Sequence, residues 1–229
     1  MRQPGPPVSA FLARLPLFAE FEASELERIA AHTQRIELTR GGILFRLGDQ
    51  PQGFHVTVHG RVKLSFTSPR GDEKVVDVIG PGQSFGEAVM FVSRPYPVTA
   101  TALGDALVLF VGRQVVFDEL ARDARFAARM IAGLSRRIHG LMADLEANSM
   151  HSGTQRVIGF LLRDCGESVE DDALELTLPV SKGVVASRLS ITQEHFSRIL
   201  HDLSAQGLIS VDGRTIRVPS VALLQAHRS

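Results

Sequence analysis

Near the C-terminus, three polar side chains have the types and the spacing needed to read a nucleic acid. Glu194, Ser197 and Arg198 lie at positions i, i+3 and i+4, so a helix would place them on one face. In the major groove of DNA, arginine can donate two hydrogen bonds to guanine, glutamate can accept one from cytosine, and serine can serve either base. Thr192 is a candidate N-cap, and we expect it and Gln193 to join the DNA contacts at the leading end of the helix. An ordinary surface ion pair between Glu194 and Arg198 is the competing interpretation.

The elements around this helix favour the DNA-reading interpretation. Upstream, residues 181–189 are typical of a short helix capped by Ser181, followed by a tight connection. Downstream, residues 209–218 are typical of a hairpin with an Asp212-Gly213 turn. A short helix, a turn, a second helix with a polar face and a hairpin together predict a winged helix-turn-helix.

Composition excludes several classes of protein. The chain has 229 residues, a hydrophobic content of 44% and a formal net charge of zero, as in globular proteins of one large or two modest domains. No apolar run approaches the roughly 18 residues of a membrane span, and residues 1–14 lack the apolar segment of a secretion signal. We therefore expect a flexible N-terminal tail over residues 1–14 and a cytoplasmic location. The single cysteine, Cys165, excludes an intramolecular disulfide and an iron–sulfur cluster held by cysteines of one chain.

Differences in local composition divide the rest of the chain, after residue 14, into three parts. Residues 15–122 contain short alternating or apolar runs between glycines, such as Phe54 to Val58 and Val75 to Ile79, which predict an antiparallel β-roll or jelly-roll sensor domain. Residues 123–148 are helical in composition, and residues 149–229 contain the winged helix-turn-helix. The expected fold class is therefore α+β.

The helix predicted over residues 123–148 has a narrow apolar seam with a period of 3.5 residues. This period is typical of a coiled coil, so we expect a dimerisation helix, although a core helix within one domain is the alternative. The seam consists of Ala127, Ile131, Leu134, Ile138, Leu141 and Leu145.

This order of domains resembles the cyclic-AMP receptor protein/FNR superfamily of bacterial transcription regulators, over about residues 15–225. Residues 80–87 are similar to the G-x-x-F-G-E signature of the family. Glu194, Ser197 and Arg198 match its E-x-x-S-R recognition pattern, which the FNR branch associates with a TTGAT-type half-site. The cyclic-AMP branch has glycine at the serine position, so Ser197 favours the FNR-like branch.

The sensing end departs from both well-known branches. In the cyclic-AMP branch, an Arg-Ser pair grips the cyclic phosphate, but the matching positions here are Pro97 and Val98. Neither side chain can donate a hydrogen bond, which argues against cyclic AMP as the ligand. The N-terminal cysteine cluster of the FNR branch is missing too. Residues 85–91 and 96–102 instead resemble the Dnr-type subgroup, which responds to nitric oxide, for which haem is the implied cofactor, and controls denitrification genes.

This resemblance implies an effector pocket between the β-roll and the dimerisation helix. A largely apolar pocket there would suit haem or a small gas-linked ligand. Its expected residues are Phe85, Gly86, Glu87, Ala88, Val89, Met90, Val98, Met130 and Leu134. His55, His59 and His139 lie in regions that could face the pocket, but none of them is assigned as an axial or metal ligand.

Together these features predict a homodimeric, sequence-specific transcription regulator. Its two recognition helices would enter successive major grooves of a palindromic TTGAT-like site, with Lys182 and Arg188 contacting phosphates of the double-stranded DNA. An effector would change the packing of the dimerisation helices and so the spacing of the recognition helices. RNA polymerase is the expected protein partner, and no membrane partner is expected. No motif of an enzyme is found. The alternative is a sensor of cyclic nucleotides or another small ligand whose winged domain docks a protein.

Overall fold

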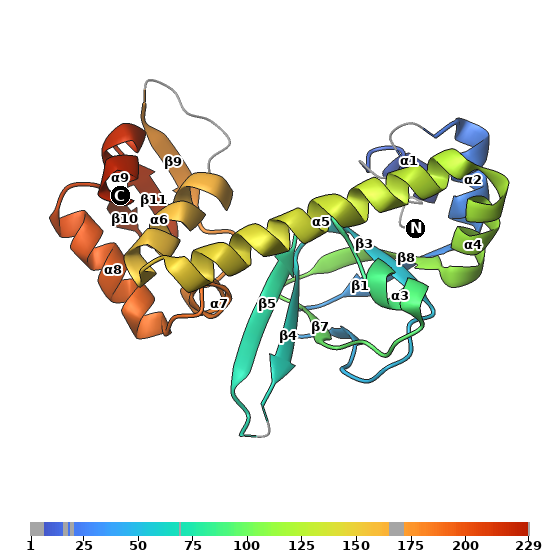
Figure 1. The fold of residues 1–229 in the computed structure, drawn as a ribbon, viewed down its shortest axis with the longest axis horizontal. Coiled ribbons are helices and arrows are strands. Elements are labelled where there is room, and N and C mark those ends of the chain that lie inside the picture. The colour runs from blue at the N-terminus through green and yellow to red at the C-terminus, as the bar shows by residue number, and fades with distance from the viewer. Residues whose placement is uncertain (1–6, 16–17, 19–20, 69, 165–171, 229) are drawn as a thin grey trace, which may run out of the picture. The chain divides into compact units, whose positions relative to one another are not determined.

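The computed structural model describes residues 7–15, 18, 21–68, 70–164 and 172–228 (Figure 1). The chain divides into two compact units, residues 1–139 and 140–229, and helix α5 (Ala124–Met150) contributes to both. Each unit contains helices and antiparallel strands, which confirms the predicted α+β class. The described helices include none that is both long enough and apolar enough to cross a membrane.

The N-terminal unit contains the predicted β-roll, built from two four-stranded antiparallel sheets (Figure 1). In order of neighbours, the first sheet consists of β1 (Thr33–Leu38), β8 (Ala106–Gly112), β3 (Gly53–His59) and β6 (Ser84–Phe85). The second consists of β2 (Ile43–Phe45), β7 (Thr99–Ala102), β4 (Val62–Thr67) and β5 (Glu73–Ile79). The strands expected around Phe54 to Val58 and Val75 to Ile79 are therefore confirmed as β3 and β5.

Two hydrophobic clusters cover opposite faces of the first sheet, because successive side chains along a strand point to opposite faces. The inter-sheet cluster receives residues from both sheets and comprises Phe45, Val62, Ile79, Phe85, Tyr96, Ala100 and Val108, with Leu38, Leu44, Leu64, Val89 and Val98 against it. The outer cluster joins the other face of β3 and β8 to the helices. Its main members are Leu12, Phe18, Phe21, Ile29, Phe54, Val56, Met90, Leu109, Val111, Phe126 and Met130.

The N-terminal helices correct two expectations from the sequence. Helix α1 (Val8–Leu12) lies within residues 1–14, where a flexible tail was predicted, and Leu12 is fully buried in the outer cluster. Helix α2 (Ala23–Ala31) begins with Glu22 as its N-cap, whose backbone N–H donates to the carboxylate of Glu25 at 2.8 Å. The S-x-x-E spacing of Ser24 to Glu27 predicts a capping box with Ser24 as the N-cap, which places the start of this helix too late.

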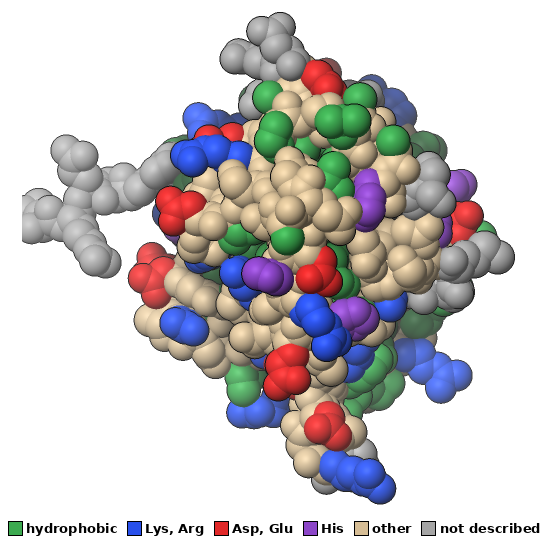
Figure 2. All heavy atoms as spheres, turned by 90° about the vertical axis from the view of Figure 1, so that its left-hand side faces the viewer, with side chains coloured by type: hydrophobic (Ala, Val, Ile, Leu, Met, Phe, Trp, Pro, Cys, Tyr) green, Lys and Arg blue, Asp and Glu red, His purple; other side chains and the backbone are tan. Residues whose placement is uncertain are grey.

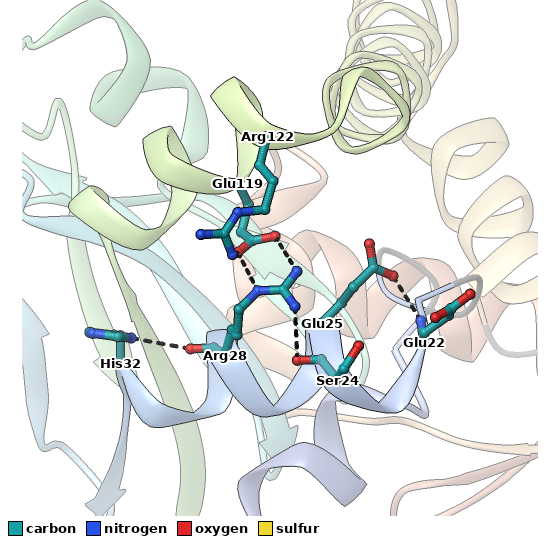
Figure 3. A network of polar contacts seen from close by, with 7 residues as sticks. All are labelled: Glu22, Ser24, Glu25, Arg28, His32, Glu119 and Arg122. Carbon is teal, nitrogen blue, oxygen red and sulfur yellow. Dashed lines mark hydrogen bonds and ion pairs between the residues drawn. The ribbon is translucent and has the colours of Figure 1, made fainter.

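An ionic network centred on one buried carboxylate joins α2 to helix α4 (Arg113–Arg122), which directly precedes α5 (Figure 3). The Glu119 carboxylate is buried and accepts hydrogen bonds from Nε and Nη2 of Arg28 at 3.0 and 3.1 Å. Arg122 Nη1 donates to the same carboxylate at 3.2 Å. Charged donors on both oxygens offset the desolvation of Glu119, so the network holds α2 against α4. Helix α3 (Glu87–Val92) completes the helices of this unit.

The described residues of the C-terminal unit form a three-stranded antiparallel sheet and four helices that follow α5. Its helices are α6 (Gly153–Asp164), α7 (Lys182–Arg188), α8 (Gln193–Ala205) and α9 (Val221–Arg228). Its strands, in order of neighbours, are β10 (Ser210–Asp212), β11 (Thr215–Val218) and β9 (Leu174–Thr177).

Most local signals in this unit are confirmed by hydrogen bonds. Ser152 and Gln155 form the capping box of α6, with backbone-to-side-chain distances of 2.7 and 3.2 Å. The hairpin differs from expectation by one residue: Asp212 pairs with Thr215, so the loop is Gly213-Arg214 and not Asp212-Gly213. Gly213 has φ 59°, a conformation that glycine adopts without steric cost.

Candidate functional site

Helix α8 has the two faces that its sequence predicts. Phe196, Ile199, Leu200 and Leu203 are buried, whereas Glu194, Ser197 and Arg198 are exposed on the first two turns. Thr192 is the N-cap, because its hydroxyl oxygen accepts a hydrogen bond from the backbone N–H of His195 at 3.1 Å. The polar face is therefore held on a helix whose opposite side is anchored in the core.

The competing ion-pair interpretation of Glu194 and Arg198 is not supported. Within the described part of the chain, the salt bridges include none between these two side chains. The carboxylate and the guanidinium are therefore exposed without neutralising one another, and both can bind an external partner. Bases in a major groove present the donors and acceptors that such a pair requires.

The other predicted DNA-contact residues lie on α7 and at the junction of α7 with α8. Ser181 caps α7 by accepting from the backbone N–H of Val184 at 3.4 Å. Lys182 and Arg188, at the two ends of α7, are half-buried. Gln193 is exposed and lies across the first turn of α7, since a Cβ atom on Gly183 would come within 2.7 Å of the Gln193 side-chain oxygen.

The wing directs its arginines to partners within the C-terminal unit. Arg214, in the hairpin loop, donates from Nε to the Leu178 carbonyl at 3.1 Å. Arg217 forms an ion pair with Glu175 at 2.7 Å. Figure 2 views the structure from the left-hand side of Figure 1 and shows Lys and Arg side chains interspersed with Asp and Glu.

Helix α5 displays most of its apolar seam to solvent. The exposed fractions of Ile131, Ile138, Leu141 and Leu145 are 64%, 56%, 45% and 67%, whereas Ala127 and Leu134 are half-buried. An exposed apolar stripe of this length on a helix indicates a missing partner surface. The alternative of a core helix covered by its own chain is not supported for this part of α5.

The residues expected to form one effector pocket are divided between the two hydrophobic clusters. Phe85 and Val98, with Val89, belong to the inter-sheet cluster, whereas Met90 and Met130 belong to the outer cluster. Ala88 is exposed and Leu134 is half-buried. The expected set does not line a single pocket, because Met90 of α3 and Met130 of α5 pack on the far side of the first sheet from Phe85. Spacing in the sequence could not reveal this separation.

His55 is the most unusual polar residue in the β-roll. Its ring is 5% exposed and lies against Phe85, Phe45 and Phe110, with centroid distances of 5.3, 5.4 and 5.2 Å. Burial lowers the pKa of His55 to about 4, so its imidazole is neutral near pH 7. Its Nδ1 has no hydrogen-bond partner in the described part of the structure. The apolar residues flanking His55 in β3 were the only sequence signal of its burial.

The structure gives no support for His55, His59 or His139 as an axial haem ligand. The aromatic rings of Phe45, Phe85 and Phe110 enclose the imidazole of His55. His59 and His139 are exposed, and His139 Nδ1 lies 2.9 Å from the Ser135 carbonyl of its own helix. The described residues also contain no group of three or more His, Cys, Asp or Glu side chains that could hold a metal ion.

Uncharged or acidic groups surround Gly86 and Glu87 of the G-x-x-F-G-E signature. Glu87 is buried, and this burial raises the pKa of its carboxyl. Burial, together with the charges of Glu87 and Asp49, raises the pKa of Tyr96 to about 12. A Cβ atom on Gly86 would lie 3.6 Å from the Tyr96 hydroxyl and 3.7 Å from His55 Nδ1. Val98 packs against the inter-sheet cluster, and neither it nor Pro97 has a side chain that could donate a hydrogen bond or a positive charge to a phosphate.

Comparisons with known proteins agree with this architecture. Residues 35–123 match the cyclic nucleotide-binding domain, and residues 155–227 match the Crp-like helix-turn-helix domain. The structure of DNR from Pseudomonas aeruginosa is 30% identical, covers 95% of this chain and 96% of that chain, and gives a TM-score of 0.51. A candidate cyclic nucleotide binding protein from Ruegeria pomeroyi is 31% identical over 96% of each chain, with a TM-score of 0.63.

A curated relative shows the same domain order in a regulator. The cyclic AMP receptor protein of Thermus thermophilus is 26% identical over 210 residues, which are 92% of this chain and 95% of that protein. Two domain matches in the expected order and relatives that span almost the whole chain lead to one conclusion. The chain belongs to the cyclic-AMP receptor protein/FNR superfamily of transcription regulators.

Proposed function

We propose that this protein is a homodimeric transcription regulator in which α8 reads a palindromic TTGAT-like site in double-stranded DNA. The observation that carries the proposal is the exposed set of Glu194, Ser197 and Arg198 on a capped helix with a buried opposite face. In this role Arg198 donates to guanine, Glu194 accepts from cytosine, and Ser197 contacts a neighbouring base. Thr192 and Gln193 lie at the end of α8 that enters the groove, and Lys182 and Arg188 contact phosphates.

The exposed seam of α5 supports the dimer. Pairing of two α5 helices would bury Ile131, Ile138, Leu141 and Leu145 against their copies. A two-fold axis between these helices would relate two α8 helices, which accounts for a palindromic site. RNA polymerase is the expected protein partner in the cytoplasm.

The test is selection of duplexes from a random pool, followed by salt titrations with the selected duplex and a scrambled one. We expect a TTGAT-type palindrome and an affinity that falls steeply with salt. Arg198→Ala should cost about 1–3 kcal/mol on the selected duplex only. Arg40→Ala is the matched control, because it removes an exposed arginine from the β-roll. Recovery of no preferred duplex would favour the alternative in which the winged domain docks a protein.

The β-roll is the proposed sensor, and its effector is not cyclic AMP. The positions corresponding to the phosphate-binding pair are Pro97 and Val98, and the charge of the buried Glu87 acts on the neighbouring residue Tyr96. Cyclic AMP should therefore leave DNA affinity unchanged. The resemblance of residues 85–91 and 96–102 to the Dnr-type subgroup supports a response to nitric oxide, which can be tested as a change in DNA affinity under anaerobic conditions. Haem titration should give no saturable Soret band at one haem per chain. A saturable band would overturn the conclusion that His55, His59 and His139 are not haem ligands.

A further inference from the structure

The helix-turn-helix rests on α6 through two residues that share one face of that helix. Gly153 and Arg156 are three residues apart in α6, so the Cα atom of Gly153 and the side chain of Arg156 lie on the same face. A Cβ atom on Gly153 would come within 3.0 Å of the His195 ring and 3.3 Å of Ile199 Cδ1, so α8 packs closely against the first turn of α6. Arg156 extends from the same face to the end of α7.

Arg156 holds the turn between α7 and α8. Its Nη1 donates a hydrogen bond of 2.8 Å to the carbonyl of Leu189, the C-cap residue of α7. This carbonyl belongs to the set that a helix leaves without an internal partner at its C-terminus, where positive charge is also favourable. Arg156 is half-buried, and its Nε is buried without a hydrogen-bond partner in the described part of the chain, so the contact is kept although one buried donor is unsatisfied.

The turn itself is strained at one residue. Ser190 has φ 58°, in the left-handed region that favours glycine. The backbone N–H of Ser190 donates to Ser187 at 3.1 Å, and that of Ile191 donates to Ala186 at 3.0 Å, which is the Schellman pattern. A turn that keeps serine in this conformation requires support from its surroundings. The bond from Arg156 to Leu189 supplies that support from outside the two helices.

We propose that Arg156 is a positioning residue for DNA reading, which fixes the direction of α8 by anchoring the α7–α8 turn to α6 without contacting DNA. The inference rests on the proposed function, because it requires that α8 reads bases. Loss of the anchor should allow α8 to rotate about the turn. Base contacts depend on angles and distances within a fraction of an ångström, whereas phosphate attraction does not, so selective binding should suffer most.

The test compares Arg156→Met, which removes the donors, with Arg156→Lys, which restores one donor and the charge. In the full-length protein, R156M should weaken binding to the selected duplex about tenfold and leave binding to a scrambled duplex and the salt slope unchanged. R156K should recover part of the loss. Lys182→Gln is the contrasting control, because loss of a phosphate contact should weaken both duplexes and reduce the salt slope.

Each other outcome is decisive. Equal losses on both duplexes with a smaller salt slope would make Arg156 a phosphate contact and overturn the proposal. A folded R156M variant with wild-type selectivity would also overturn it, while leaving the proposed function intact. Lack of any duplex preference in the wild-type protein would overturn both. If R156M does not fold, the comparison moves to a Ser190→Gly background and to Gly153→Ala, whose added methyl should displace α8 and reduce selective binding.

Discussion

Acidification should destabilise the β-roll through one buried side chain, His55. Its folded-state pKa is lowered from 6.5 to about 4 by burial among aromatic rings. As the pH falls, His55 therefore becomes protonated near pH 6.5 in the unfolded chain but only near pH 4 in the folded chain. The neutral ring thus contributes stability that is complete above pH 6.5 and is lost as the pH falls toward 4.

The size of the effect follows from the change in pKa. A fall from 6.5 to about 4 corresponds to about 3 kcal/mol of unfolding free energy. About 2 kcal/mol of this should be lost between about pH 7 and about pH 5. The variant His55→Phe places an aromatic ring in the same cluster but cannot titrate, so its unfolding free energy should fall by about 2 kcal/mol less over the same interval.

The chain provides its own probe for this measurement. Tyr96 is the only tyrosine, tryptophan is absent, and the Tyr96 ring stacks on Phe45 at 3.6 Å in the inter-sheet cluster. Tyrosine fluorescence during urea unfolding therefore reports the β-roll separately from the winged domain. His59→Gln controls for loss of a histidine from the same strand. Equal losses of unfolding free energy in the wild-type and His55→Phe proteins would refute the role of His55.

Three further outcomes test other parts of the structure. Asp172 accepts hydrogen bonds from the backbone N–H of Ala222, in the first turn of α9, and from the hydroxyl of Ser220, and these bonds lower its pKa. Stability from this contact should therefore be present above about pH 4 and disappear as the pH falls below it; faster amide exchange over residues 221–228 in Asp172→Ala would show the loss, and unchanged exchange would contradict it. Ser190→Gly should stabilise the C-terminal unit by about 0.5–1 kcal/mol in thermal unfolding, because glycine adopts φ 58° without steric cost, and a destabilised variant would show that serine makes a compensating bond. Ile138→Glu should convert the proposed dimer to monomers in sedimentation experiments and weaken duplex binding, whereas a dimeric variant would place the interface elsewhere.

The local features of α8 were predictable because they depend on spacing within a few residues. The N-caps Thr192 and Ser181 precede their helices in the expected positions, and the apolar residues of α8 recur at the helical period. The period of 3.5 residues in α5 likewise predicted an apolar seam, and most of this seam is exposed to solvent in the structure. Each of these signals concerns the order of residues along one element, which the sequence records directly.

Long-range packing decided the features that the sequence missed. Helix α1 is too short to be stable alone, and it forms where Leu12 can be buried against other elements. The expected effector residues separate because Met130 packs on one face of the first sheet and Phe85 lies on the other. The sequence alone determined which side chains face outward on α8. Only the tertiary structure could place Arg156 at the end of α7, because that contact joins residues 33 positions apart through the packing of separate helices.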